Sequence, residues 1–398
     1  MKRMLIVSHA MEIGGAERSL LGLLESIDPT RVSVDLFLLR HEGELLDLIP
    51  DYINLLPPIP QYNALARPIV RTIKEGHLLI SAARLFGSYK AAEFQKKNKI
   101  TGYGVAIEYS HKYTKRFMPH IQPDVEYDVA ISFLTPHYFV AEKVRAKKKI
   151  AWIHTDYSTG QFDIDSELDM WNAYDRIVSI SKIVTETFLS GFPSLADKIV
   201  QIENIIPKVS IEYQSDCFTV ENEMPADGMI KLLSVGRFCD PKNFDNVPEI
   251  CRNILKEFPN VKWYLIGFGI DEEKIRNKIK EASMENHVII LGKKDNPYPY
   301  IKACDLYVQP SRYEGKCVSV IEAQILAKPV VITRYATSNS QLEDGVDGII
   351  VPMDNLGCAS GIVKLLQDKT KMSVLSSMCA ERDYTNSGEI EKIYQLLE

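Results

Sequence analysis

The segment 304–334 is the part of the sequence that most constrains the fold. Residues 305–309 alternate in polarity and are rich in β-forming side chains, which predicts a short strand. A loop ending in Glu-Gly interrupts them, and its glycine permits a sharp turn into a helix. Apolar residues at steps of three and four predict that helix over 316–327, and 330–333 has the composition of a buried strand. We therefore expect a strand–loop–helix–strand unit.

Two carboxylates stand out within this unit. Glu314 lies in the loop, at the carboxyl end of the first strand. Glu322 follows Val318 by four residues and precedes Ile325 by three, so we expect it on the same inward-facing stripe of the helix. A carboxylate on a packing face is costly unless a hydrogen bond satisfies it. For a Glu pair taken alone, a surface Glu314 and a Glu322 that escapes to the helix edge is the commoner arrangement; the alternative is a polar ligand.

The start of the predicted helix offers a second kind of binding group. Backbone N–H groups at Lys316, Cys317 and Val318 have no acceptor within the helix and form a ready site for an anion. An anion pocket with one carboxylate at its mouth and one behind it suits a nucleotide diphosphate that carries a polyhydroxylated group.

These residues also resemble a known family. The pattern P-S-x-Y-E-G, six further residues, E-A, and then P-V-V-x-T resembles the signature of retaining GT-B glycosyltransferases of the GT4 kind (glycosyl transferases group 1), surface polysaccharide type. The likeness is close over 231–352 and looser over the N-terminal half. Lys316-Cys317 stands where many members have small or apolar residues with a proline. The resemblance implies an α/β, GT-B fold, in which two doubly wound, Rossmann-like parallel-sheet domains face each other across a cleft.

Length and composition fit that expectation. With 398 residues, the chain can form about two domains that each bury a core. A net charge of −6 argues against a general nucleic-acid binder. Seven cysteines, odd in number and without a C-x-x-C pair, predict reduced thiols in a cytoplasmic protein rather than disulfides or a zinc site. No apolar run approaches the roughly 18 residues that a membrane span needs.

The chain is expected to divide near its middle. Strands alternate with helices along both halves, which indicates parallel sheets, and the polar, irregular stretch 207–228 separates them. We expect an N-terminal, acceptor-side Rossmann-like domain at 1–207 and a C-terminal, nucleotide-sugar-binding domain at 208–379. By resemblance to the family, a helix within about 380–398 packs back on the N-terminal domain.

Further candidate residues follow the ends of predicted strands, where ligands bind in open parallel sheets. Gly14 and Gly15 lie between the first strand and its helix and would allow close approach of a ligand, although many such turns carry glycines for geometry alone. His154 ends a later strand; a lone histidine there is more often structural, but its position makes it a candidate. Gly292 and Lys293 follow the strand 288–291.

Two cations follow the first strand of the C-terminal half. Arg237 stands two residues after the strand 231–235, and Lys242 lies five residues further on. Most such side chains are solvated surface residues, but G-R-F followed by K-N resembles the family's diphosphate clamp. Breaking a sugar–phosphate bond leaves negative charge on a nucleoside diphosphate, and fixed cations stabilise that charge. Two cations also lessen the need for a metal ion, and none is expected.

The resemblance assigns roles to the candidates in the C-terminal half. Glu322 would accept hydrogen bonds from the ribose hydroxyls, and Glu314 would orient the transferred sugar. The amides of 316–318 would bind sugar or phosphate. Gly292 and Lys293 would border the base.

In the N-terminal half, the resemblance places Gly14 and Gly15 under the diphosphate. His154 would bond the sugar or support charge near the acceptor. The expected catalytic residues are His154, Arg237, Lys242 and Glu314.

The stretch 67–116 differs in charge from the rest of the chain. It has eleven basic residues against Glu75, Glu93 and Glu108, a net charge of +8. The basic residues are Arg67, Arg71, Lys74, Arg84, Lys90, Lys96, Lys97, Lys99, Lys112, Lys115 and Arg116. Because apolar residues lie between them, the stretch fits an anionic membrane surface and a solvated helix face about equally well.

Together with these observations, the resemblance implies a retaining hexosyltransferase. It would move a hexose-type sugar from a UDP-linked donor to a hydroxyl of a glycan or lipid-linked acceptor, in capsule, exopolysaccharide or O-antigen biosynthesis. We expect it in the cytoplasm, at the inner face of the plasma membrane. The alternatives are a nucleotide-sugar epimerase on a GT-B-like fold and a non-catalytic subunit of a glycosyltransferase pair. The latter should have lost Glu314, Arg237 or Lys242, and all three are present.

Overall fold

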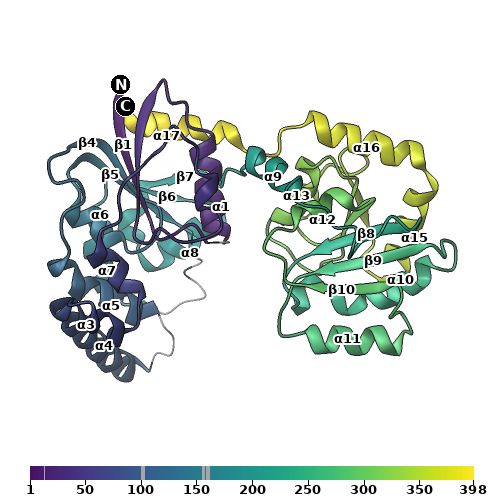
Figure 1. Ribbon diagram of the computed structural model, residues 1–398, viewed down its shortest axis with the longest axis horizontal. Helices are drawn as coiled ribbons and strands as arrows, with labels where there is room; N and C mark the ends of the chain where they lie inside the picture. Colours follow the sequence, from purple (N-terminus) through teal and green to yellow (C-terminus); the bar gives the residue numbers. More distant parts are fainter. Residues whose placement is uncertain (13, 100–103, 155–156, 158–161) are drawn as a thin grey trace. The chain divides into compact units, whose positions relative to one another are not determined.

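The computed structural model describes residues 1–12, 14–99, 104–154, 157 and 162–398. The chain folds into two compact units (Figure 1): unit 1 is formed by Met1–Pro207 with Asn386–Glu398, and unit 2 by Lys208–Thr385. Each unit is built on a parallel β-sheet with helices packed against it.

Within the described residues, unit 1 has a seven-stranded sheet in the order β3-β2-β1-β4-β5-β6-β7, and every pairing is parallel. The strands are β1 (Lys2–Ser8), β2 (Val32–Leu38), β3 (Asn54–Leu55), β4 (Tyr127–Ser132), β5 (Ala146–Ile153), β6 (Arg176–Ser179) and β7 (Ile199–Gln201). Met4 and Ile6 of β1 belong to one core cluster, whereas Leu5 and Val7 belong to another. Burial on both faces explains the continuous apolar runs of these strands.

The helices of unit 1 cover both faces of that sheet. They are α1 (Gly15–Glu25), α2 (Pro60–Asn63), α3 (Ile69–Lys74), α4 (Leu78–Asn98), α5 (Gly104–Thr114), α6 (His137–Lys143), α7 (Ile164–Asn172), α8 (Lys182–Gly191) and α17 (Ile390–Leu397). Helices α1 and α17 share one core cluster with the strands, and α6, α7 and α8 share the other. Helix α17 buries Ile393 and Tyr394 there, and the Asp28 N–H donates to the Tyr394 hydroxyl over 2.7 Å.

Helices α3, α4 and α5 form a separate layer at one end of unit 1 (Figure 1). Helices α4 and α5 approach closely, since a Cβ added at Gly87 would lie 2.8 Å from the backbone oxygen of Tyr109. Ala91, Val105 and Tyr109 form a small buried cluster between them. None of the helices in the described ranges is long and apolar enough to cross a membrane.

Unit 2 repeats the architecture with six parallel strands among its residues, all of which are described, in the order β10-β9-β8-β11-β12-β13. The strands are β8 (Ile230–Val235), β9 (Val261–Ile266), β10 (Val288–Gly292), β11 (Leu306–Gln309), β12 (Val330–Thr333) and β13 (Ile349–Val351). The helices are α9 (Lys208–Ser215), α10 (Val247–Ile254), α11 (Glu272–Glu281), α12 (Tyr298–Ala303), α13 (Val318–Ile325), α14 (Ser338–Gln341), α15 (Asn355–Gln367) and α16 (Lys369–Glu381). Helices α10 and α15 share a core cluster with the strands.

The expected strand–loop–helix–strand unit is present as β11, α13 and β12, with one correction. Glu322 and Ile325 are buried, but Val318, expected on the same stripe, is 45% exposed. Val318 is the first residue of α13, and side chains on a helix tilt toward its N-terminus. Its side chain therefore extends past the end of the packed face.

Both sheets reverse their strand order at one point. In unit 1 the reversal falls between β1 and β4, and in unit 2 between β8 and β11. Ligands of open parallel α/β sheets bind beyond the carboxyl ends of the strands at such a point. The loops that follow these four strands are therefore the first place to search for function.

Candidate active site

A buried ion pair joins the two loops at the reversal point of unit 2. Lys242 comes from the turn Asp240–Lys242 after β8, and Glu314 from the loop after β11. The Lys242 Nζ lies 2.6 Å from Glu314 Oε1, and the two side chains are 18% and 10% exposed. The sequence predicted both residues as catalytic, and the structure brings them into direct contact.

A chain of hydrogen bonds fixes the Glu314 carboxylate. The Gln309 side-chain amide donates to the Ser311 hydroxyl over 2.9 Å, and that hydroxyl donates to Glu314 Oε1 over 2.6 Å. The Thr337 hydroxyl donates to the Glu314 backbone oxygen over 2.6 Å. Because these groups come from three segments around β11, the carboxylate is held in one orientation before any ligand binds.

The environment keeps Lys242 protonated. Burial acts to lower the pKa of its amine, but the charges and hydrogen bonds around it act the other way, and the net result is a raised pKa. Burial also raises the pKa of the Cys317 thiol, so that neighbour is uncharged at neutral pH and Glu314 is the balancing charge. Lys242 is therefore a fixed cation.

Arg237 lies beside this pair but is used differently. It is exposed, and within the described part of the chain its guanidinium has no hydrogen-bond partner. The Lys242 side chain passes over the neighbouring Gly236, with its Cε 3.3 Å from where a Cβ of that glycine would stand. The loop after β8 thus presents one satisfied cation and one available cation.

Glu322 occupies a separate position on α13. It is only 3% exposed, and its Oε1 accepts a hydrogen bond from the Tyr298 hydroxyl over 2.9 Å. The Glu322 side chain is therefore on the packed face of α13 and not at the exposed edge of the helix.

The anion site expected at the start of α13 needs a correction. The Cys317 backbone N–H is not available, because it donates to Gln341 Oε1 over 2.6 Å. The Cys317 side chain is also buried. The predicted anion site consisted of the amides of Lys316, Cys317 and Val318. At Cys317, the Gln341 side chain of α14 takes the place of a ligand.

Gly292 and Lys293 lie at the end of β10, which is separated from β8 by one strand, β9. Gly292 has φ +74°, a conformation that favours glycine, and its oxygen accepts from the Gly267 N–H over 2.9 Å. Lys293 is exposed and lies 3.4 Å from Asp295. Their predicted contact with a base stays a prediction.

In unit 1, Gly14 and Gly15 follow β1 and begin α1. A Cβ at Gly15 would meet nothing within 4 Å, and one at Gly14 would meet only the flexible carboxylate of Glu17. Neither glycine is required by the packing of the described residues. The open space beside them is consistent with a ligand at this turn.

His154 follows β5 and packs against aromatic rings. Its ring lies 4.6 Å from that of Phe133 and stacks parallel to Trp152. Burial lowers its pKa to about 4, and its Nε2 has no partner among the described residues. At neutral pH this imidazole is uncharged, so it can exchange hydrogen bonds but does not supply positive charge.

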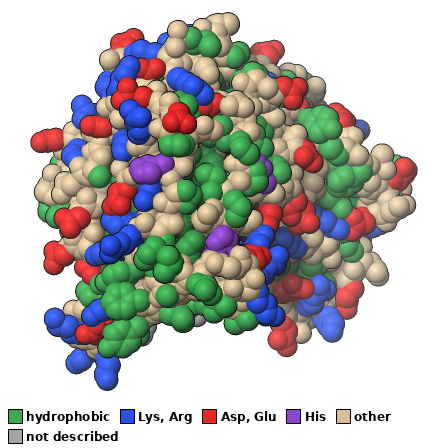
Figure 2. All heavy atoms as spheres, turned by 60° about the vertical axis from the view of Figure 1, so that its left-hand side comes forward, with side chains coloured by type: hydrophobic (Ala, Val, Ile, Leu, Met, Phe, Trp, Pro, Cys, Tyr) green, Lys and Arg blue, Asp and Glu red, His purple; other side chains and the backbone are tan. Residues whose placement is uncertain are grey.

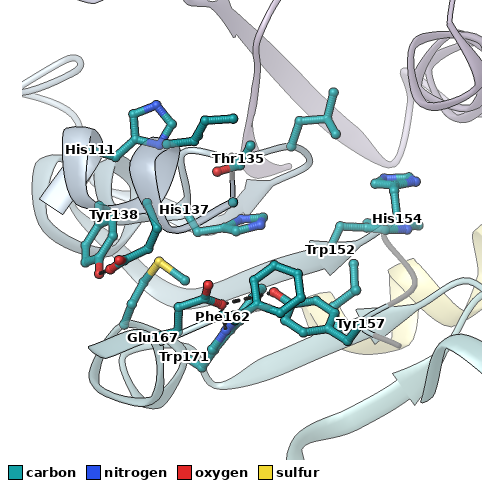
Figure 3. Close-up of a pocket in the computed structure, with 16 residues that line it drawn as sticks. His111, Thr135, His137, Tyr138, Trp152, His154, Tyr157, Phe162, Glu167 and Trp171 are labelled. Carbon is teal, nitrogen blue, oxygen red and sulfur yellow. Dashed lines mark hydrogen bonds between the residues drawn. The ribbon is translucent and has the colours of Figure 1, made fainter. Parts of the chain in front are cut away.

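Sequence reasoning missed a cavity of about 340 Å³ in unit 1, which His154 also lines (Figure 3). Two carboxyl side chains, Glu108 of α5 and Glu167 of α7, reach into its lining. The sequence analysis counted Glu108 only as one of three acids that oppose the basic residues of 67–116. Its spacing of three residues from the buried Val105 was the available signal, since it places Glu108 on the inward face of α5.

The described residues contain no group of three or more His, Cys, Asp and Glu side chains that could hold a metal ion. At the unit 2 site, Lys242 is a cation held in place by Glu314, and Arg237 is an exposed one.

The fold and this site define a class. Two parallel α/β units, of which one carries a cation–carboxylate pair at the reversal point of its sheet, correspond to the GT-B fold of nucleotide-sugar-dependent transferases. Residues 221–379 match the family model "Glycosyl transferases group 1". Over these residues the chain is similar to that family.

Comparisons with individual proteins find similarity to glycosyltransferases as well. The chain is 28% identical over 166 residues to the poly(glycerol-phosphate) alpha-glucosyltransferase of Bacillus subtilis, covering 40% of this chain and 24% of that protein. It is 27% identical over 194 residues to the poly(ribitol-phosphate) alpha-N-acetylglucosaminyltransferase of Staphylococcus aureus, covering 44% and 39%. These alignments thus span less than half of either relative.

A solved structure matches over the whole chain. The crystal structure of Anabaena HepE in complex with UDP and glucose has a TM-score of 0.62 and 16% identity, and the match covers 100% of this chain and 99% of that one. At this identity, the likeness establishes the fold.

Proposed function

We propose that this chain is a retaining glycosyltransferase of the GT4 kind. It transfers a hexose-type sugar from a UDP-linked donor to a hydroxyl of a glycan or lipid-linked acceptor in surface polysaccharide biosynthesis. The donor binds to unit 2 and the acceptor to unit 1. The UDP and glucose named with the HepE structure, and the glycosyltransferase names of the two relatives, support this assignment.

The observation that carries the proposal is the Lys242–Glu314 pair with Arg237 beside it. The leaving group of the reaction is a nucleoside diphosphate that gains negative charge as the bond to the sugar breaks. Cations held in place before the reaction stabilise that charge without reorganising. Glu314, fixed by Ser311, would orient the sugar hydroxyls, and we expect turnover to be insensitive to EDTA because the two cations neutralise the diphosphate.

A donor screen tests this function. UDP-, GDP- and ADP-linked hexoses are incubated with the protein, and release of nucleoside diphosphate is measured with and without EDTA. We expect release from a UDP-hexose, with the same anomeric configuration in the product by NMR. Interconversion of the nucleotide sugar without release would indicate an epimerase instead. No release and no UDP binding would reject the proposal.

We also propose that unit 1 contacts an anionic membrane through α3 and α4. The charge of +8 counted for 67–116 overstates what faces outward, since four of its cations are paired within the protein. Arg84 is half-buried and donates to backbone oxygens. Residues 100–103 of the stretch lie outside the described residues. The exposed cations of the stretch that form no ion pair with a described residue are Lys74, Lys96, Lys97, Lys99 and Arg116.

Exposed apolar side chains on α4 give a second reason to expect membrane contact. Residues 78, 85, 86 and 89 recur along one side of α4 and are between 49% and 64% exposed; they are Leu78, Leu85, Phe86 and Tyr89. Figure 2 shows hydrophobic side chains gathered at the lower edge of the molecule with Lys and Arg beside them. A helix whose exposed stripe is apolar, ending in three lysines, fits the interface of an anionic bilayer.

Vesicle sedimentation tests the membrane contact. We expect binding to vesicles with an anionic lipid, weakened by salt as charges are screened. Two variants should reduce it: Lys96→Glu with Lys97→Glu and Lys99→Glu, and Leu78→Ser with Leu85→Ser. Lys278→Glu with Lys280→Glu on α11 is the matched control. Equal binding to neutral and anionic vesicles, or no change in both test variants, would leave this surface merely solvated.

A further inference from the structure

Strand β11, which precedes the loop of the unit 2 ion pair, has polar side chains on one of its two buried faces. Tyr307 and Gln309 lie on this strand, and both side chains are 0% exposed. Leu306 and Val308, the other two residues of β11, belong to the apolar core cluster of unit 2. Side chains alternate between the faces of a strand, so Tyr307 and Gln309 share the opposite face. Buried polar groups are costly unless they are hydrogen-bonded, so these two need partners.

A first line of hydrogen bonds runs from Tyr307 to Glu314. The Glu314 carboxylate is paired with a lysine and can only accept, so the Ser311 hydroxyl gives its one proton to it. The Ser311 oxygen accepts from the Gln309 side-chain N–H, which leaves the Gln309 amide oxygen for the Tyr307 hydroxyl, 3.1 Å away. Tyr307 is therefore the donor at the start of the line. Burial raises the pKa of Tyr307 well above its ordinary value of 10, so the hydroxyl keeps its proton.

A second line joins the Tyr307 hydroxyl to Lys242. The backbone N–H of Val235, the last residue of β8, donates to that hydroxyl over 3.3 Å. The Val235 backbone oxygen accepts from the Ser319 hydroxyl over 3.1 Å. Because the Ser319 proton is used there, its oxygen accepts from the Cys317 thiol, 3.3 Å away. The Cys317 sulfur in turn accepts from Lys242 Nζ over 3.7 Å.

The two lines end on the ion pair and form a closed polar ring with it, since Lys242 Nζ and Glu314 Oε1 are 2.6 Å apart. Among the described residues, the Glu314 carboxylate accepts hydrogen bonds only at Oε1. Lys242 has three ammonium N–H groups, of which one goes to Glu314 and one to Cys317. The ring therefore leaves one oxygen of Glu314 and one N–H of Lys242 for a ligand.

Packing alone does not explain the Tyr307 hydroxyl. A phenylalanine ring would fill nearly the same space in the core and would need no hydrogen-bond partner. The hydroxyl instead joins two lines that both end on the groups which the proposed function uses. Groups that face developing charge are most effective when they are held in place before the reaction, and supporting hydrogen bonds provide that precision.

We propose that Tyr307 is a positioning residue of the transfer reaction, whose hydroxyl fixes Lys242 and Glu314 relative to each other through the polar ring. This inference rests on the proposed transferase function and adds a residue that the sequence pattern did not single out. Without the hydroxyl, the Gln309 amide can turn over. Its oxygen would then accept the Ser311 proton, and Glu314 would lose that hydrogen bond.

The variant Tyr307→Phe tests the proposal with the smallest change, since it deletes one oxygen. We expect kcat for release of nucleoside diphosphate to fall about tenfold, because misplacing a reacting group by about 1 Å can cost 10²-fold. The donor KM and the affinity for UDP should stay within twofold of wild type, because Glu322 is not part of the ring. A loss of stability alone would not produce this split between kcat and KM.

The matched control is Tyr62→Phe in unit 1. Tyr62 is also 0% exposed, and its hydroxyl donates to the Pro119 backbone oxygen over 2.7 Å. The control therefore loses a buried hydroxyl and its hydrogen bond, as Tyr307→Phe does, but has no link to the ion pair. We expect a lower melting temperature with an unchanged kcat. A fall in kcat as large as that of Tyr307→Phe would overturn the proposal.

A second variant, Gln309→Leu, breaks the first line at its next residue and carries the test if Tyr307→Phe does not fold. It should also lower kcat about tenfold. Because both variants break the same line, their effects should not add, and the double variant should match the slower single variant within twofold. Additive losses, about a hundredfold in the double variant, would show that the two residues act independently and would overturn the proposal.

The wild-type protein separates this inference from the proposed function. Stoichiometric UDP binding, measured by calorimetry, shows which variants are folded. If the wild type releases nucleoside diphosphate and every folded variant of Tyr307 or Gln309 keeps kcat within twofold of it, only the positioning role fails. If the wild type releases none from any UDP-, GDP- or ADP-linked hexose, the transferase function fails, and the positioning role fails with it.

Discussion

The two units have the same sheet architecture but opposite chemistry at their strand ends. In unit 2 the reversal point holds a buried Lys242–Glu314 pair and the exposed Arg237. In unit 1 the corresponding edge holds neutral His154 and a cavity walled by aromatic rings. The shared fold determines where ligands approach, and the side chains determine which ligands are accepted.

The difference follows the two halves of a group transfer. A diphosphate leaving group needs positive charge held in place, and under the proposed function unit 2 supplies it. Under the proposed function, unit 1 receives an acceptor hydroxyl, which is uncharged until late in the reaction. The histidines that line its cavity, His111, His137 and His154, have pKa values lowered by burial and are neutral at pH 7. Predictions that break one half without the other test this division directly.

The largest expected effect comes from the cations of unit 2. Lys242→Ala and Arg237→Ala should each lower turnover by about 10²-fold or more, the scale for removing one preorganised group that faces developing charge. Steady-state release of nucleoside diphosphate measures this. Lys278→Ala, on the exposed side of α11, is the control. Near wild-type turnover in both test variants would remove the charge-based half of the comparison.

The second effect concerns Glu167 in the unit 1 cavity. Burial raises its pKa to about 7 against an ordinary value of 4.5, with smaller contributions from Trp171, Glu108, Tyr157 and Asp163. Between these values the folded state binds more protons than the unfolded state, so its contribution to stability is present at low pH and is lost as pH rises through 7. The loss is at most about 3 kcal/mol.

Denaturant unfolding of the wild type and Glu167→Gln at pH 5 and pH 8 isolates the contribution of Glu167 to the free energy of unfolding. The buried histidines have lowered pKa values and act in the opposite direction below pH 6.5, but they are present in both proteins and cancel in the difference. We expect the stability of Glu167→Gln relative to wild type to improve from pH 5 to pH 8. An unchanged difference would show that Glu167 is solvated.

The third prediction divides the two carboxylates of unit 2. Glu322→Gln should weaken binding of UDP by about 1.5–3 kcal/mol, because a carboxylate accepts hydrogen bonds from a ribose diol more strongly than an amide does. Glu314→Gln should chiefly lower turnover, since it removes the partner of Lys242. Calorimetry with UDP compares them, with Glu249→Gln on α10 as control. Equal, undetectable changes in UDP affinity would contradict the division.

Sequence reasoning reached unit 2 more fully than unit 1 for a physical reason. Glu314, Glu322 and their loop lie within one local strand–loop–helix–strand unit, so spacing alone places them. Two predictions were wrong: that the Val318 side chain is buried and that the Cys317 amide is free. Both depend on contacts with neighbouring segments, at the end of α13 and with the Gln341 side chain. Pattern alone does not supply such contacts.

The unit 1 cavity could not be read from spacing at all. Its polar wall joins Glu108 to Ser166, which is 58 residues away, and to Tyr138 on another helix. The surface charge of 67–116 was similarly overcounted, because Lys115 pairs with Glu142 outside the stretch. The sequence showed that this stretch is net positive, and the structure added the exposed apolar stripe of α4.

The smallest expected effect extends the comparison to the surfaces of the two units. Helix α4 of unit 1 ends in exposed lysines beside apolar residues, whereas α11 of unit 2 pairs Lys278 with Glu281. Lys96→Gln should weaken binding to anionic vesicles by about 1 kcal/mol, roughly fivefold, the contribution of one basic residue near such a surface. Lys278→Gln should change it by much less. Equal changes in both variants, measured by sedimentation at fixed salt, would mean that the attraction depends on total charge rather than on the α4 surface.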